Sequence, residues 1–515
     1  MAQKPKNPTL VSEKSNSSQK FFADVAKMLT GNGLAQFLRV LLSPVISRLY
    51  SPAAFGILQN FSSLGNILSV LSALRYEATI LLPKKDSDAA TQLSISFLIL
   101  TLFFLLSTPI IYFSRSWLAD LLNSPGLENY VWLAPLLASI ITAYTAFRQW
   151  ISRKGKYLQV SSALVINEVV SDGATAGMGF LGFANSSTMI LSRFFGQLLS
   201  TIFLGVSVIK EDLRIILNNC GREKIISGIK QYKKFPLYNI WASFFNNVSL
   251  YMPGLLLSAY FSPVIAGYYS LGQNVIRLPI QLASGSIGLV FFQRSAKAYH
   301  EGNLAHVVFE TFSRLVSYGL FPMLLILVIG QELFVVVFGA QWGEAGVYAQ
   351  ILSIWSFIMF LVTPLSCLTN ILGRNEVSLV LNVIGFFTRL VSFLIGGALN
   401  NPRLSLILFS SIDIIIYGIY IFWSTTLSGV TAIKTVETIF STLLVTGPFI
   451  LLLLIFKFVN PLKGSAVEIL GIPLSILSLL VVSAILAVIY YLMVIFRDKS
   501  IRDSLSVYVK RIGRK

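Results

Sequence analysis

The stretch YSPAAFG at residues 50–56 closes one long apolar run and opens the next. A related stretch, FSPVIAG, does the same at residues 261–267. A shorter pair of similar turns follows the fourth and tenth apolar runs, SRKGK at 152–156 and LGRNE at 372–376. Six apolar runs separate the two copies in each case. An even spacing keeps both copies in the same orientation, which predicts two parallel repeats of six helices each.

The composition places these repeats in a membrane. The chain of 515 residues is 55% hydrophobic and only 12% charged, whereas soluble domains carry about 25% charged residues. A membrane span needs about 20 mostly apolar residues. We therefore expect an all-α polytopic membrane protein with about 14 transmembrane helices, two pseudo-symmetric six-helix lobes and a C-terminal helix pair. The predicted spans are 22–49, 55–82, 91–113, 128–147, 157–183, 187–209, 236–260, 264–293, 307–338, 347–372, 377–398, 402–424, 437–457 and 466–496.

The distribution of basic residues predicts the orientation. If the N-terminus is cytoplasmic, only Arg115, Arg403, Lys457 and Lys463 fall in loops on the opposite side, as the positive-inside rule requires. Topology then accounts for most of the net charge of +18, and nucleic-acid binding is not needed to explain it. The expected organisation is a cytoplasmic tail at 1–20, an N-lobe at 21–209, a basic cytoplasmic linker at 210–235, a C-lobe at 236–426, two further helices at 437–496 and a basic cytoplasmic tail at 497–515.

The sequence lacks the residues that several classes of function require. The two cysteines, Cys220 and Cys367, are too few for a disulfide framework or a metal cluster. No Walker motif and no nucleophile–base constellation is present, so we expect neither an enzyme nor a bound metal or cofactor. The N-terminal residues 1–20 are polar and do not resemble a removable signal peptide. Tryptophans near helix ends, among them Trp150 and Trp342, are expected in an interfacial aromatic belt.

Three motifs resemble those of a known protein family. They are LYSPAAFG at 49–56, LRYEATILLP with the following KKDSDA at 74–89, and the run from Gly272 to Pro279. Over nearly its whole length the chain resembles the bacterial oligosaccharide flippases, which translocate O-antigen and other polysaccharide repeat units. Their superfamily also contains multidrug-and-toxin extrusion transporters and lipid II flippases. Lipid II flippases typically bear an arginine where this chain has Asn274, and Arg277 lies one turn later.

The resemblance implies a cargo and a mechanism. The cargo is an undecaprenyl-diphosphate-linked oligosaccharide, moved across the bacterial cytoplasmic (inner) membrane for O-antigen, capsule or exopolysaccharide assembly. The mechanism is alternating access of an antiporter driven by a proton or sodium gradient. Implied partners are membrane lipids, a polysaccharide polymerase and a chain-length regulator. A multidrug exporter or a lipid II flippase of the same superfamily remains an alternative. A membrane glycosyltransferase would need a large outer loop, and the predicted outer loops are short.

Arginines inside the predicted spans are the candidate substrate-binding residues. A charge at the bilayer centre costs roughly 2.5–3.5 kcal/mol, and a guanidinium offers a fork of donors that suits phosphate oxygens. Arg39, Arg75, Arg277 and Arg389 lie well inside their spans. We expect them to bind the diphosphate, with pairing to helix-borne acids as the alternative. Arg193 lies nearer a helix end, where snorkelling explains it.

The few acids within spans, Glu77, Glu168, Asp172 and Asp413, are the candidate ion-coupling residues. Glu168 and Asp172 are spaced i,i+4 and share one helix face. Two like charges in a low-dielectric site favour proton uptake or a cation between them, which is the requirement for a coupling relay. The alternative is a salt bridge to an arginine. Glu77 stands two residues from Arg75, and on a regular helix such residues point to different faces.

Overall fold

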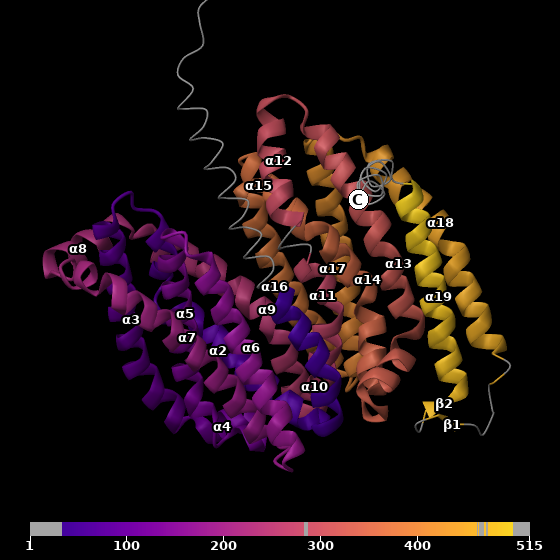
Figure 1. The fold of residues 1–515 in the computed structure, drawn as a ribbon, viewed down its shortest axis with the longest axis horizontal. Helices are drawn as coiled ribbons and strands as arrows, with labels where there is room; N and C mark the ends of the chain where they lie inside the picture. The colour runs from indigo at the N-terminus through magenta and orange to yellow at the C-terminus, as the bar shows by residue number, and fades with distance from the viewer. Residues whose placement is uncertain (1–32, 283–286, 461, 463–467, 470–471, 498–515) are drawn as a thin grey trace, which may run out of the picture. The chain divides into compact units, whose positions relative to one another are not determined.

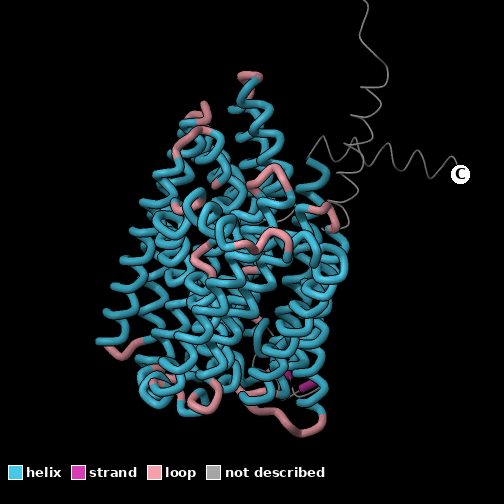
Figure 2. Tube along the Cα trace, turned by 90° about the vertical axis from the view of Figure 1, so that its left-hand side faces the viewer, coloured by secondary structure: helices cyan, strands magenta, loops and turns pink. Residues whose placement is uncertain are grey.

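We describe the protein from a computed structural model, which covers residues 33–282, 287–460, 462, 468–469 and 472–497. The chain divides into two compact units, 1–266 and 267–515. Long helices dominate both, with short connections at their ends (Figure 2). Among the described residues the only strands are β1 (Glu468–Ile469) and β2 (Ile472–Pro473), which form a two-residue antiparallel pair.

The first unit consists of a helix over residues 33–49 and the helices that follow it (Figure 1). The long ones are α2 (Pro52–Ser72), α3 (Asp86–Phe113), α5 (Ala134–Arg153), α6 (Tyr157–Phe180), α7 (Ser186–Leu217) and α9 (Ile240–Tyr260). The short ones are η1 (Tyr76–Leu81), α4 (Arg115–Leu121), η2 (Pro125–Leu127), η3 (Val131–Leu133), α8 (Arg222–Gln231) and η4 (Phe235–Asn239).

The helix α10 (Pro263–Ile276) begins at the end of the first unit and leads into the second. The second unit continues with α11 (Leu278–Leu282), α12 (Gly288–His300), α13 (Leu304–Phe338), η6 (Ala340–Trp342), α14 (Gly343–Leu365), α15 (Cys367–Ile371), α16 (Asn375–Ala398), α17 (Pro402–Leu427), α18 (Ala432–Val459) and α19 (Leu474–Arg497). Helices α18 and α19 lie side by side along α13 at one edge of this unit (Figure 1).

The predicted number of spans agrees with these helices. Ten of the described helical segments are long and apolar enough to cross a membrane. Four further segments bring the described residues to the predicted fourteen: 33–49, α6, α9 and the interrupted segment α10–α12. The protein is therefore an all-α multi-pass membrane protein, and the predicted fold class is confirmed.

The two Ser-Pro turns that revealed the repeat meet each other in the first unit. The Ser51 side chain accepts a hydrogen bond from the Ala54 amide at 3.3 Å and caps α2, with Pro52 in its first turn. Gly56, at the end of the motif, packs against the backbone of Pro263 so closely that an added Cβ would lie 1.7 Å from its carbonyl oxygen. Only glycine fits this crossing.

Two predicted spans differ from the structure. The second span, 55–82, is not one helix: α2 ends at Ser72, Leu74 and Arg75 adopt positive φ values of 48° and 67°, and η1 follows. The eighth span, 264–293, is interrupted at Arg277, between α10 and α11. Apolar composition extends across both breaks, so hydropathy alone reads each as continuous.

The region predicted as a loop linker, 210–235, is largely helical, because α7 runs on to Leu217 and α8 occupies Arg222–Gln231. Helix α9, assigned to the C-lobe by the repeat, packs against α2 within the first compact unit. Trp150 and Trp342 lie near helix ends, as expected, and both are buried, with 1% and 0% of their surfaces exposed. The predicted tail 1–20 lies outside the described residues, as does the predicted tail 497–515 apart from Arg497, which ends α19.

Candidate functional site

A charge network crosses the interior of the first unit. Arg39, on the helix 33–49, donates from Nε to Glu168 Oε2 at 3.1 Å, and its Nη2 also pairs with Glu168 Oε1. Glu168 is buried in α6, whereas about a third of the Arg39 side chain (34%) remains exposed. The bidentate geometry is the strong form of an arginine–carboxylate pair. The structure thus brings together one predicted substrate residue and one predicted ion-coupling residue.

Asp172 lies one turn beyond Glu168 on α6, half-buried, where the charges of both Arg39 and Arg193 act on it. Polar side chains surround this face: Asn167 Nδ2 donates to Gln197 Oε1 at 2.8 Å. The positive charges of Arg39 and Arg193 therefore balance the negative charges of Glu168 and Asp172 within one lobe. Arg193, which the sequence placed at a helix end as a snorkelling residue, is part of this balance.

The pair Arg75–Glu77 occurs because α2 ends early. Arg75 Nη1 lies 3.2 Å from Glu77 Oε1, although two residues apart on a regular helix would point to different faces. The positive φ values of Leu74 and Arg75 turn the chain back so that the side chains meet. Arg75 Nε and Glu77 Oε2 are buried with no hydrogen-bond partner among the described residues.

The second unit holds a fully enclosed pair. Arg389 of α16 donates to Asp413 Oδ2 of α17 from Nε at 3.1 Å and from Nη2 at 2.6 Å. Trp355 Nε1 of α14 donates to the same oxygen at 2.9 Å. The Arg389 guanidinium also lies 5.3 Å from the centre of the Phe409 ring. Asp413 has no exposed surface, so this cluster holds three helices together and presents little charge to a ligand.

Arg277 is placed differently from the other three predicted substrate residues. It occupies the turn between α10 and α11 and is partly exposed. Arg39, Arg75 and Arg389 each form an ion pair with a carboxylate. Arg277 forms none within the described part of the chain. Its charge acts on the buried Tyr269, as does that of Arg389.

Sequence reasoning missed a polar cluster at the other end of the first unit. Asp212 of α7 accepts a hydrogen bond from Trp150 Nε1 at 2.8 Å and lies 3.4 Å from Lys154 Nζ. Lys154 and Arg153 both pair with Asp86, at 2.9 and 2.8 Å. Burial lowers the pKa of Lys154, but its hydrogen bond to Asp86 and the charge of Asp212 outweigh this and raise it above its ordinary value. The basic motif 152–156 was the available signal, and it was read only as a turn.

The fold and the fourteen segments define an all-α multi-pass membrane protein with charged pairs buried in each unit. The solved structures it is similar to share this fold. A lipid II flippase, MurJ, in an inward closed conformation superposes with a TM-score of 0.69 at 12% identity, covering 92% of this chain and 99% of that one. An inward-facing multidrug resistance transporter of the MATE family, in the MOP superfamily, gives 0.58 at 15% identity, covering 76% and 94%.

The sequence itself assigns the family. Residues 45–347 match the model of the polysaccharide biosynthesis protein family, and the chain belongs to this family. A curated relative, the lipopolysaccharide biosynthesis protein WzxC of Escherichia coli (strain K12), is 23% identical over 403 residues, 75% of each chain. The resemblance to the oligosaccharide flippases and their superfamily, predicted from short motifs, is confirmed.

Proposed function

We propose that this chain is a flippase, not an enzyme. It moves undecaprenyl-diphosphate-linked oligosaccharide repeat units from the cytoplasmic to the periplasmic leaflet of the bacterial inner membrane. Family membership supports a role in polysaccharide biosynthesis, and the fold shared with solved flippases and exporters supports transport. The product would feed O-antigen, capsule or exopolysaccharide assembly, with a polymerase and a chain-length regulator acting on it next. Both termini face the cytoplasm in this proposal.

The observation that carries the proposal is Arg277. An arginine that keeps its charge at a break in a membrane helix, with no carboxylate partner among the described residues, is available to an anionic ligand. A diphosphate supplies the acceptors that the guanidinium fork matches.

The other predicted arginines take different parts in the proposal. Arg39 is one-third exposed beside Glu168, and its guanidinium would become available to an anionic ligand of the first unit when that carboxylate is neutralised. Arg75 has a similar exposed share, although its Nε is buried without a hydrogen-bond partner among the described residues. Arg389 is held by Asp413 and Trp355 in a nearly closed cluster, so its main effect would be on the stability of the second unit.

Ion coupling is assigned to Glu168 and Asp172. Protonating Glu168, or placing a sodium ion beside the two carboxylates, would weaken the ion pair between Glu168 and Arg39. That exchange links an ion gradient to the availability of a phosphate-binding charge, which is what an alternating-access antiporter requires. Glu77 and Asp413 are each tied to a single arginine neighbour, and their coupling role stays a prediction.

The alternatives have different requirements. A multidrug exporter for cationic drugs would need an excess of acids within its spans, whereas here the described arginines balance or exceed them. A lipid II flippase would be expected to carry arginine at Asn274. Neither alternative is favoured by a specific contact in the structure.

Deletion of the gene tests the proposal. We expect the undecaprenyl-diphosphate-linked repeat unit to accumulate on the cytoplasmic face and the surface polysaccharide to disappear. Plasmid-borne wild type should restore both. Normal surface polysaccharide with no accumulated lipid intermediate would remove the proposed function.

A further inference from the structure

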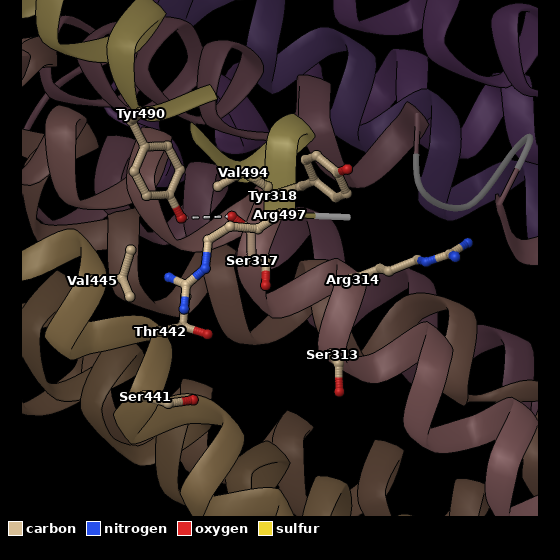
Figure 3. A pocket seen from close by; sticks show the side chains of 10 residues that line it. All are labelled: Ser313, Arg314, Ser317, Tyr318, Ser441, Thr442, Val445, Tyr490, Val494 and Arg497. Atoms are coloured by element: carbon tan, nitrogen blue, oxygen red, sulfur yellow. Dashed lines mark hydrogen bonds between the residues drawn. The ribbon is translucent and has the colours of Figure 1, made fainter. Parts of the chain in front are cut away.

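The second unit contains a cavity of about 320 Å³ that none of the proposed transport chemistry uses. It lies among α13, α18 and α19, and Figure 3 shows the side chains around it. Its volume is at the lower end of the ~300–1,000 Å³ typical of ligand pockets, which suits a head group better than a whole lipid. Its polar lining includes Ser313, Ser317, Ser441, Thr442 and Arg497.

One cation is aimed into this cavity. Arg497 reaches from the end of α19 toward Thr442 of α18 (Figure 3) and forms no ion pair with the described residues. Arg314, the other arginine of the lining, points away from Arg497 in the same view. It is held by Glu310 at 2.9 Å. The buried hydroxyl oxygen of Ser313 has no hydrogen-bond partner in the described part of the chain, so the cavity offers a positive charge and an unused hydroxyl.

The cavity lies at one end of the three helices. Ser313 is near the start of α13, Ser441 is near the start of α18, and Arg497 ends α19. The outward faces of the same helices are apolar and exposed: Phe440 and Phe496 are 60% and 68% exposed. In a multi-pass membrane protein such faces contact acyl chains. A ligand that fits this site therefore joins an anionic head to hydrocarbon chains.

We propose that the cavity binds the phosphodiester head group of an anionic glycerophospholipid. Arg497 pairs with the phosphate, and the Ser313 hydroxyl donates to one of its oxygens, while the Thr442 hydroxyl donates to the Thr438 carbonyl at 2.8 Å and lines the site. Basic pockets between membrane helices on the cytoplasmic side are suited to such head groups. In sequence, residues 498–515 carry six lysines and arginines against two aspartates, and this net positive charge would strengthen attraction to the same leaflet. The site is independent of the cargo and of the proposed transport function.

Native mass spectrometry of the purified full-length protein tests this site, with phosphatidylglycerol, phosphatidylcholine and undecaprenyl diphosphate as separate probes. We expect phosphatidylglycerol to be retained in preference to phosphatidylcholine. Arg497→Gln should lower the apparent phosphatidylglycerol affinity about tenfold, a loss of 1.4 kcal/mol. The matched control Arg314→Gln should leave the affinity within about twofold, because that guanidinium is directed away. The hydroxyl variant Ser313→Ala should weaken binding in the same direction.

Elution as a single species in size-exclusion chromatography establishes that each variant is folded, and the hydroxyl variant serves if Arg497→Gln is not. Equal retention of the two phospholipids would overturn the proposal. So would equal losses in the two arginine variants. Undecaprenyl diphosphate that displaces phosphatidylglycerol and shows the same dependence on Arg497 would reassign the cavity to the cargo lipid and contradict the phospholipid site.

Discussion

Replacing the buried pair Arg389–Asp413 should separate a structural charge from a cargo-binding one. Asp413 has no exposed surface and receives two hydrogen bonds from Arg389 and one from Trp355. Removing one partner of a buried pair leaves an uncompensated charge and costs about 3–5 kcal/mol. Asp413→Leu and Arg389→Met should each be destabilised by this amount.

The double variant Arg389→Met/Asp413→Leu should recover most of that loss, because apolar replacement of a whole buried pair is often neutral or stabilising. At roughly 2–4 °C per kcal/mol for a domain of 150–250 residues, each single variant should unfold roughly 6–20 °C lower. The assay is thermal unfolding in detergent at one fixed scan rate, since membrane-protein unfolding is commonly irreversible.

The matched control is Arg403→Met, which breaks the exposed Arg403–Glu344 pair and should cost at most about 1 kcal/mol. If the stable double variant also retains flipping activity, Arg389 is structural. Single variants no less stable than the control, or a double variant no better than the singles, would refute this reasoning.

Three further predictions concern the first unit. Gly56→Ala should lower the unfolding temperature, because the added Cβ would overlap the Pro263 carbonyl oxygen; the expected loss of stability is about 1–3 kcal/mol. The control Gly173→Ala should leave the unfolding temperature unchanged, because an added Cβ there meets no neighbouring atom. Glu168→Gln and Asp172→Asn should abolish ion-dependent transport in vesicles without lowering membrane level, and unchanged transport in both would end the coupling assignment. Because the pKa of Lys154 lies above its ordinary 10.5, its contribution to stability is complete below that pH and is lost as the pH rises through the raised value. The melting difference between wild type and Lys154→Met should therefore shrink above pH 10.5 and stay constant between pH 7 and 9.

The helices were predictable because hydrocarbon thickness sets the length that an apolar span needs. The breaks were not predicted. The break after Ile276 had a local signal in Pro279, which has no N–H to donate to the Val275 carbonyl. The end of α2, at Ser72, has no proline or glycine beside it. The chain there adopts its conformation through tertiary contacts, such as Tyr76 donating to the carbonyl of Ile229 at 3.3 Å.

The charged residues of the candidate site were predicted from the sequence. Which arginine forms an ion pair with which carboxylate could not be predicted. Glu168 and Asp172 share a face by spacing alone. That Arg39 is the partner of Glu168 depends on how helices far apart in sequence pack. The alternative reading of the arginines, as partners of helix-borne acids, describes Arg39, Arg75 and Arg389 in the structure. Arg277 differs because its helix breaks at that position.

The most direct measurement of the central claim is complementation of the deletion strain by Arg277→Gln at wild-type membrane level, with the lipid-linked repeat unit quantified on each face of the inner membrane. The account predicts that Arg277→Gln leaves the intermediate on the cytoplasmic face, while the control Arg403→Gln restores its transfer. Full transfer by Arg277→Gln would contradict the claim that this arginine binds the cargo diphosphate.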